Sequence, residues 1–407
     1  MKAALQPSNH TITLSNGSTH TYRLRSLQIT TSEEGQQHHV DIQSWTKFCA
    51  SVFSYKASPP PPSYFARHFY NDPRRDAGLV RVLIHCPNNS EEEQLHGEIV
   101  SSVRIFRRTL STGPSGDVMP IEAGGIGEVC TSPNHQRRGL SKILLKDAIK
   151  IMSSSVKEAD EMACSLLHAS PDFRPVYSKV GGYESVRSAW SIVPIKIKHL
   201  TNEKSCDDNV DNNGWCVRQA KFPEDASQLQ QLHAEYSEKR FITIMRSVQY
   251  WKEYVSAELG DTLWVLAKPP STADGEDTIL AWISVRKRGD RYQLREFGVD
   301  KSTNNSVLAT LVMRRLLGVS LDQAGENVGT EKEVSLLLPT FVLSEMKQET
   351  ISNEGDAALF LNIEKATEEN DNGWMYVNFD ESQQSVLELT TRETDPIPHL
   401  IWPTDSF

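Results

Sequence analysis

The feature that most constrains the fold of this chain is an order of strands and helices that apolar periodicity predicts twice along its 407 residues. In each half, a first strand is followed by helical segments, three strands, a helix and a further strand. The two orders have about the same length, although sequence identity between the halves is slight. A repeated order of this kind predicts an internal structural duplication.

The first half is predicted to be mixed α/β. Apolar runs with strand periodicity predict strands at 22–29, 79–85, 98–108, 126–131, 162–168 and 188–197. The last of these would close the sheet of the first half. Helical spacing of apolar residues predicts helices at 40–53, 140–152 and 173–180.

The second half is predicted to have strands at 215–220, 262–268, 279–287, 292–299, 334–339 and 374–379. Its helices are expected at 223–236, with a proline at the first position, and at 247–259 and 306–317. Residues 201–214 are polar, acidic and Asn-rich, which is typical of a linker. The predicted protein is therefore α/β (α+β), with tandem domains at 1–200 and 215–407 joined by an acidic linker, and each domain has a mixed central sheet flanked by helices.

Charge also differs between the two predicted halves of the chain. Residues 1–200 hold 23 Lys+Arg and 18 Asp+Glu, whereas residues 201–407 hold 20 and 35, so a basic half is joined to an acidic half. The bland interpretation is two solvated surfaces of different composition. The alternative is that the first half attracts an anion and the second half gathers a cation.

Several classes of protein are disfavoured by composition. No stretch approaches 18 consecutive apolar residues, and the N-terminus lacks the apolar core of a signal peptide, so no membrane association is expected. Six cysteines lie far apart without a CxxC pair, which favours a reduced, cytoplasmic protein without a zinc site or other metal. An isoelectric point near 5.7 without a basic stripe disfavours nucleic-acid binding.

The most informative segment is 128–145, EVCTSPNHQRRGLSKILL, in which a strand runs into a loop with two arginines and a glycine, directly before a helix. The first turn of a helix has unpaired N–H groups and a partial positive charge, so it attracts phosphate. Gly139 permits a close approach of the backbone, and Arg137 and Arg138 add fixed charge. The segment predicts a pyrophosphate site, although it has neither a Walker A sequence nor a three-glycine dinucleotide fingerprint.

This segment resembles the Gln/Arg-x-x-Gly-x-Gly/Ala acetyl-CoA loop of the GNAT N-acetyltransferases. The later run YSKVGGY at 177–183 is similar to the Tyr-x-x-x-Gly-Phe element of that family, and the resemblance covers roughly residues 20–197. The chain departs from the family pattern at Ser141, where Gly or Ala is usual, and in the extra glycine before Tyr183. We expect Ser141 to alter the approach of the pyrophosphate slightly, and the extra glycine puts the local loop geometry in question.

The resemblance implies the roles of the site residues, with acetyl-CoA as co-substrate. Backbone groups of Val129, Cys130 and Thr131 would contact the thioester carbonyl and the pantetheine. The pyrophosphate would be held by Gln136, Arg137, Arg138, Gly139, Leu140, Ser141 and Lys142. Tyr177 would be the general acid that protonates the leaving thiolate, because a phenol with a pKa near ~10 can deliver that proton.

The general base is left open. Glu122, Glu128 and His168 are candidates near the expected cleft, and a carboxylate there could act through water. Residues 130–145 with the run His168-Ala169-Ser170 also resemble the Eis-type acetyltransferases, which join two GNAT folds. That likeness adds the terminal carboxylate of Phe407 as a candidate base.

The acceptor is predicted to be a small cationic amine. The two-domain layout and the ending WPTDSF resemble the fungal lysine N-acetyltransferases of lysine catabolism, which implies the side-chain amine of L-lysine. Candidate acceptor contacts are His168, Ser170 and Asp405, with Glu296 and Asp300 as further candidates. The second half has no matching loop at its equivalent position and is not expected to bind CoA.

The sequence leaves three alternatives open. The acceptor could be a polyamine or an aminoglycoside. It could be a protein or peptide, in which case an open groove is expected beside Tyr177. The chain could also bind acyl-CoA without catalysis. The oligomeric state is not predicted.

Overall fold

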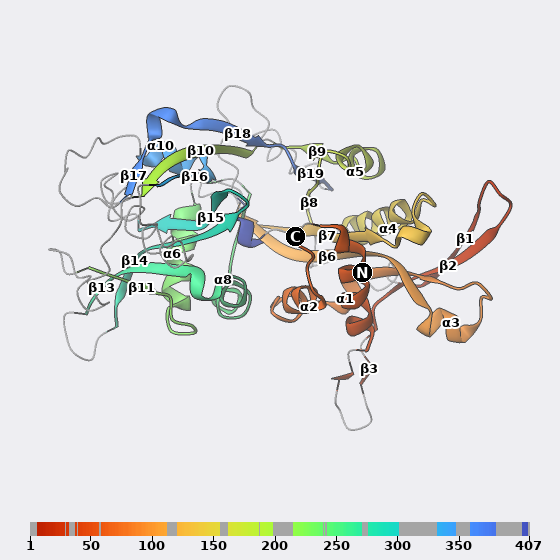
Figure 1. Ribbon diagram of the computed structural model, residues 1–407. Helices are drawn as coiled ribbons and strands as arrows, with labels where there is room; N and C mark the ends of the chain where they lie inside the picture. Colours follow the sequence, from red (N-terminus) through yellow and green to blue (C-terminus); the bar gives the residue numbers. More distant parts are fainter. Residues whose placement is uncertain are drawn as a thin grey trace.

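The computed structural model describes residues 6–28, 30–31, 37–38, 40–56, 58–111, 120–154, 162–186, 188–197, 215–238, 240, 242–270, 276–300, 332–346, 359–379 and 401–405. These residues form two large sheets, each with helices packed against it (Figure 1). The predicted linker 201–214, the predicted helix 306–317 and Phe407 lie outside the described residues. No described helix has the length and apolarity that a membrane span needs.

The first sheet has the strand order β1-β2-β5-β6-β7-β8-β19-β9. All its neighbouring pairs run antiparallel except β7 and β8, which are parallel. Its strands are β1 (Ser8–Thr13), β2 (Thr19–Ser26), β5 (Val80–His85), β6 (Glu98–Ser111), β7 (Ile121–Thr131), β8 (Cys164–His168), β19 (Trp374–Asn378) and β9 (Glu184–Ser185). Two short strands pair nearby: β3 (Thr30–Thr31) with β4 (Gln37–His38).

Helices cover both faces of this sheet. On one face, α4 (Leu140–Ser154) buries an apolar stripe that includes Leu140, Leu144, Ala148 and Ile151. α5 (Arg174–Gly181) packs beside α4. On the other face, α1 (Val40–Val52) and α2 (Pro62–Tyr70) bury Trp45, Phe65 and Phe69 against the strands. The short helix α3 (Glu91–His96) begins at a Ser90/Glu93 capping box.

The second sheet has the order β11-β13-β14-β15-β16-β10-β17, and β18 and β12 lie off these paths, paired with β10 and β6. Its strands are β11 (Cys216–Gln219), β13 (Leu263–Lys268), β14 (Thr278–Arg288), β15 (Arg291–Val299), β16 (Lys332–Pro339), β10 (Ser188–Ile197), β17 (Leu359–Leu361) and β18 (Thr367–Asp371). The short strand β12 (Thr243–Ile244) belongs to the first sheet. Its helices are α6 (Ala226–Ser237), α7 (Val248–Tyr250), a π-helical turn (Trp251–Val255), α8 (Ser256–Leu259) and α10 (Thr340–Met346). Single 3-10 turns lie at Phe53–Tyr55, Ala77–Leu79, Pro133–His135, Gly260–Thr262, Ile363–Lys365 and Pro403–Asp405.

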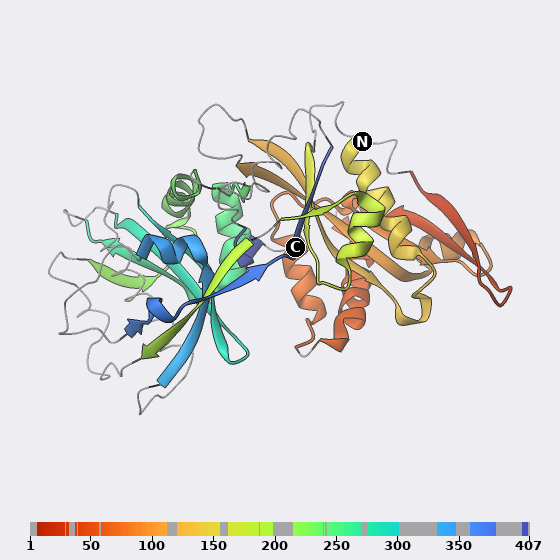
Figure 2. The ribbon, with the colours of Figure 1, turned by 90° about the horizontal axis from the view of Figure 1, so that it is seen from above.

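The two sheets exchange strands. β10 follows the first half along the chain but pairs with β16 over eight residues of the second sheet. In return, β19 leaves the second half and pairs with all five residues of β8 (Figure 2). The prediction that 188–197 closes the first sheet is therefore wrong, because periodicity identifies a strand but not its partner.

The start of α6 also differs from the prediction. Residues 221–226 form a turn closed by Asp225 N to Lys221 O and Ala226 N to Pro223 O, so the helix begins at Ala226 and not at Pro223. The Asp225 carboxylate reinforces this turn by accepting from the Lys221 N–H at 2.7 Å.

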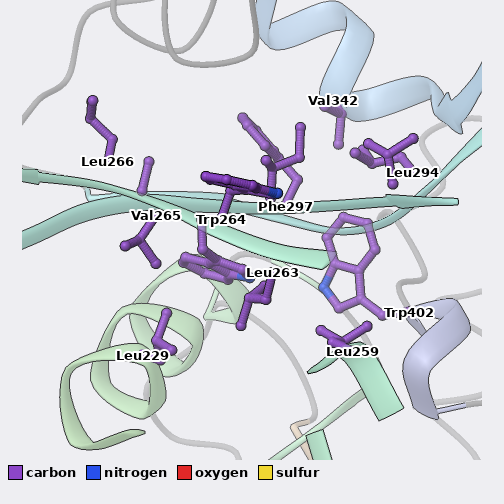
Figure 3. Close-up of a cluster of buried hydrophobic side chains, with 14 of the residues drawn as sticks. Leu229, Leu259, Leu263, Trp264, Val265, Leu266, Leu294, Phe297, Val342 and Trp402 are labelled. Atoms are coloured by element: carbon purple, nitrogen blue, oxygen red, sulfur yellow. The ribbon is translucent and has the colours of Figure 1, made fainter. Parts of the chain in front are cut away.

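Residues 401–405 contribute to the cores of both halves. Ile401 joins a cluster that includes Leu110 and Leu166 of the first sheet, whereas Trp402 packs in the core of the second sheet with Leu259 and Leu294 (Figure 3). Leu229 of α6 and Val342 of α10 belong to the same core. The segment therefore contributes to both halves of the molecule.

Candidate active site

The first sheet opens between β7 and β8. These parallel strands pair only from Ala123 with Cys164 to Ile126 with Leu167, and β8 ends at His168. Among the described residues, β7 has no β8 partner from Gly127 to Thr131. An interior strand edge of this kind presents backbone donors and acceptors to an extended ligand.

A β-bulge lies at the start of this open edge. The register between β6 and β7 shifts between Ser102 and Arg104, and Glu128 adopts a left-handed backbone conformation with φ 54°. A glutamate in this region is strained, and such strain is often kept where it aims a side chain at a functional site.

The bulge places the Glu128 carboxyl in an unusual environment. Its side chain is 6% exposed, and neither carboxyl oxygen has a hydrogen-bond partner among the described residues. The nearest cationic group is Arg104, with Nη1 3.7 Å from Glu128 Oε1, which is longer than a hydrogen bond. Burial raises the pKa of Glu128 to about 7, while Arg104 lowers it and Asp72 raises it. This carboxyl can therefore exchange a proton near neutral pH.

The other predicted carboxylate base does not have these properties. Glu122 forms an ion pair with Arg74 and accepts a 2.5 Å hydrogen bond from Thr109. Burial opposes ionisation, but these partners outweigh it and hold the pKa of Glu122 below its usual value. A carboxylate engaged in this way is not suited to take a proton.

The predicted pyrophosphate loop has the backbone of an anion site. Arg137 and Gly139 both have positive φ, 60° and 78°, and α4 begins directly after them at Leu140. Apart from its chain neighbours, no atom of the described residues lies within 4 Å of where a Gly139 side chain would start, so the approach to the first turn is open. The unpaired N–H groups of that turn, which includes Leu140, Ser141 and Lys142, fit a phosphate.

The two arginines of the loop differ in role. Arg138 donates from Nη1 to the Tyr22 hydroxyl and from Nη2 to the Asn134 carbonyl, both at 2.8 Å, so it anchors the loop. Arg137 is exposed. Gln136 is exposed as well, and its amide donates to the Thr131 carbonyl at 3.3 Å.

The strand residues before the loop, Val129, Cys130 and Thr131, lie on the part of β7 that has no described β8 partner. Cys130 is buried, with its Sγ 3.9 Å from the Sγ of Cys49, and its carbonyl accepts from the Ser101 hydroxyl at 2.9 Å. Val129 and Thr131 are half-buried. This arrangement is compatible with the backbone role predicted for these three residues.

Tyr177 lies on α5 and is half-buried, edge-to-face with Tyr183 at 6.2 Å between ring centroids. Burial raises the pKa of Tyr177 to about 12, so its hydroxyl stays protonated through the physiological range. The two glycines before Tyr183 each have a structural reason. Gly182 ends the helix with φ 71°, and a side chain at Gly181 would lie 2.7 Å from the Tyr183 ring.

His168 and Ser170 lie between the end of β8 and the start of α5. His168 Nε2 is 2.9 Å from Asp371 Oδ2, and its ring meets the edge of Trp374. The hydrogen bonds to His168 outweigh burial and lower the pKa of Asp371. Ser170 is exposed, and its carbonyl accepts from the Phe173 and Arg174 N–H groups.

Asp405, a predicted acceptor contact, lies in a buried ion pair. This residue is 1% exposed, and its carboxylate accepts from Arg246 Nη2 at 2.6 Å, from Arg246 Nε at 3.1 Å and from the Tyr250 hydroxyl at 3.0 Å. Glu296 is buried on the same arginine. Both carboxylates are therefore occupied by a buried cation and do not face solvent.

Sequence reasoning missed Asp72, Arg104, Arg108 and Asp371. Three of them form one buried group: Asp72 Oδ2 accepts from Arg104 Nη2 at 3.2 Å and from Arg108 Nη1 at 3.0 Å. The one available signal was the presence of arginines within a strand that is otherwise apolar.

Residues 37–186 match the family model described as an acetyltransferase (GNAT) domain. No curated protein sequence matches the chain.

Similar solved structures cover most of the chain. A probable N-acyltransferase from Enterococcus faecalis has a TM-score of 0.50 at 11% identity, over 88% of this chain and 72% of that one. N-myristoyltransferase from Saccharomyces cerevisiae, with bound myristoyl-CoA, has 0.49 at 11%, over 88% and 83%. Eis1 from Mycobacterium abscessus has 0.48 at 12%, over 90% and 76%.

The fold is thus GNAT-like, and the first half of the chain contains a GNAT acetyltransferase domain. This domain defines the class of protein as an acetyl-CoA-dependent acyltransferase.

Proposed function

We propose that this chain transfers the acetyl group of acetyl-CoA to a primary amine of a small cationic acceptor, with the side-chain amine of L-lysine as the first candidate. The observation that carries the proposal is the Glu128 carboxyl, which is buried without a hydrogen-bond partner among the described residues, at the bulge beside the open edge of β7. An acetyltransferase needs such a group, because its amine substrate is protonated in water and must be neutral to attack.

In this proposal the first half holds acetyl-CoA. The backbone of Val129, Cys130 and Thr131 lies along the acyl and pantetheine arm, where its donors would polarise the thioester carbonyl. The pyrophosphate lies on the loop and the first turn of α4, held by the N–H groups of Gly139–Lys142 with Gln136 and Arg137 beside them. Arg138 anchors the loop through its hydrogen bonds to the Tyr22 hydroxyl and the Asn134 carbonyl.

Two side chains move protons. Glu128 accepts a proton from the acceptor ammonium, and the neutral amine then attacks the thioester carbonyl carbon. As the new C–N bond forms and the C–S bond breaks, Tyr177 gives its phenolic proton to the departing sulfur. The attacking nitrogen loses its remaining extra proton as the amide forms, and this proton restores the Tyr177 phenol. Glu128 then releases its proton to solvent, so the products are the acetylated amine, free CoA and one proton.

A cationic acceptor is supported by charge. The second half carries 35 Asp+Glu against 20 Lys+Arg, and Asp371 brings a carboxylate from that half to His168 at the end of β8. A negative potential there raises the local concentration of a cationic amine. L-lysine is placed first because the two-domain layout and the chain ending resemble the fungal lysine N-acetyltransferases. The Phe407 carboxylate remains an alternative base.

A peptide acceptor is the second candidate. Phe173 and Val176 are large apolar side chains that remain 58% and 37% exposed, and both lie just before Tyr177 along the chain. Apolar surface beside the proposed acid would suit an extended acceptor better than it suits free lysine.

The test is release of CoA from acetyl-CoA in the presence of L-lysine, a polyamine, an aminoglycoside or a lysine-containing peptide. We expect turnover with at least one small amine and a large loss in Glu128→Gln, whose side chain has nearly the same shape but cannot accept the proton. CoA binding without release for any acceptor would favour a non-catalytic acyl-CoA-binding protein. Full activity of Glu128→Gln would refute the assigned base.

A further inference from the structure

We propose that Asp72 is a positioning residue, which holds the Arg104 guanidinium so that it does not form a hydrogen-bonded pair with the Glu128 carboxylate. This inference rests on the proposed role of Glu128 as the base. Asp72 does not belong to the acetyl-CoA loop, and it lies after α2, on the face of the sheet that carries α1 and α2.

The contacts of Arg104 give the first argument. Its Nη2 has two acceptors, Asp72 Oδ2 at 3.2 Å and the His68 carbonyl at 3.3 Å. Only Nη1 lies toward Glu128, at 3.7 Å from Oε1. A guanidinium normally binds a carboxylate through two parallel hydrogen bonds, so Arg104 has been drawn out of that geometry.

Two aromatic rings also hold the Arg104 guanidinium in this place. Arg104 lies 4.0 Å from the centroid of the Phe106 ring and 5.1 Å from that of Phe69. These cation–π contacts fix the plane of the guanidinium. The two rings and Asp72 thus set the location of Arg104 together. Of these three groups, Asp72 is the one that carries a charge.

Asp72 is itself firmly held. It is 1% exposed, its Oδ1 accepts from the Arg74 N–H at 3.0 Å, and its Oδ2 accepts also from Arg108. Burial opposes ionisation of Asp72, but Arg108 and Arg104 outweigh it and lower its pKa. Asp72 is therefore a permanent negative charge over the working pH range.

The groups around Glu128 leave Asp72 and Arg104 as the charges that matter. Cys49 of α1 and Tyr64 of α2 also interact with Glu128, but burial raises the pKa of both, that of Tyr64 to about 12, so they are neutral near pH 7. Arg104 favours the carboxylate and Asp72 disfavours it. Asp72 thereby keeps Glu128 basic enough to take a proton.

The test is the pH profile of kcat/KM, together with a carbon NMR titration of the Glu128 carboxyl assigned by its loss in Glu128→Gln. In Asp72→Asn, Arg104 is released to pair with Glu128 and the repelling charge is gone. The apparent pKa of the acid limb and the midpoint of the Glu128 NMR titration should both fall, by about one pH unit. In Arg108→Gln, the charge of Asp72 is less compensated, so both should rise.

Asp147→Asn is the matched control. Asp147 accepts from Arg81 at 2.6 Å in another largely buried pair of the same domain, so its loss tests stability without touching the Glu128 environment. Asp147→Asn should leave the pH profile of kcat/KM and the Glu128 NMR midpoint unchanged. If Asp72→Asn does not fold, as judged by its thermal melt, the direction in which Arg108→Gln shifts the Glu128 midpoint still tests the inference.

An unmoved midpoint in folded Asp72→Asn, or a fall in Arg108→Gln, would overturn the inference while leaving the proposed function intact. If Glu128 does not titrate near neutral pH in the wild-type protein, or if Glu128→Gln retains the acid limb, the proposed function itself fails.

Discussion

His168 Nε2 lies 2.9 Å from Asp371 Oδ2, although the two residues are 203 positions apart along the chain. His168 ends β8 of the first sheet, and Asp371 ends β18, which pairs with β10 of the second sheet. Three residues later the chain enters β19 and rejoins the first sheet. This contact therefore marks the point where the exchanged strand crosses from one sheet to the other.

Gly373 lies at this crossing, where a side chain would be crowded by His168 and Asp371. A side chain there would lie 2.7 Å from His168 Cε1 and 2.9 Å from Asp371 Oδ1. We expect Gly373→Ala to destabilise the protein by about 2 kcal/mol, measured by denaturant unfolding, because the crowded groups must move. In the His168→Ala background, where the ring is absent, most of that cost should disappear. An equal cost in both backgrounds would show that the ring is not responsible.

Glu128→Gln should stabilise the protein at alkaline pH while it lowers activity. Burial raises the pKa of Glu128 to about 7 from the 4.5 of an exposed glutamate, so ionising it costs folding free energy. That cost is absent below pH 4.5, grows as the pH rises, and is complete above pH 7. We expect Glu128→Gln to gain about 2 kcal/mol at pH 8 and nothing at pH 4, measured by unfolding at each pH. A pH-independent difference would contradict the assigned protonation.

Tyr177→Phe should lower kcat by about a hundredfold and leave the dissociation constant of CoA unchanged, because the ring and its packing on Tyr183 stay in place. Burial holds the pKa of Tyr177 at about 12, so the wild-type rate should show no decline from this group up to about pH 10. Rapid-quench measurement of the acetylated product separates this step from product release. Unchanged turnover would remove the acid role.

Arg137 and Arg138 should respond differently to substitution. Arg137→Gln is expected to weaken CoA binding by about tenfold, by calorimetry, with no change in melting temperature, because the exposed side chain contributes charge alone. Arg138→Gln should lower the melting temperature as well, because it loses the bonds to Tyr22 and Asn134. If both variants bind CoA like the wild type, the loop is not the pyrophosphate site.

Much of the fold was predictable because it depends on local pattern. The apolar stripe of α4 and the apolar runs of β5, β6 and β15 are visible in a window of a dozen residues, and their predicted bounds agree with the structure to within a few positions. The loop before α4 was equally accessible, because the positive φ of Gly139 and the free first turn of a helix are properties of neighbouring residues.

The sequence by itself determined most of the elements, the glycine-containing loop before α4 and the division of charge between the halves. Only the tertiary structure decided that β10 and β19 change places between sheets, that Asp405 is buried on Arg246, and that Glu128 is left without a hydrogen bond among the described residues while Arg104 binds Asp72. The physical reason is that pairing, burial and charge compensation depend on groups far apart along the chain, and a local pattern carries no information about which distant partner a strand or a carboxylate will meet.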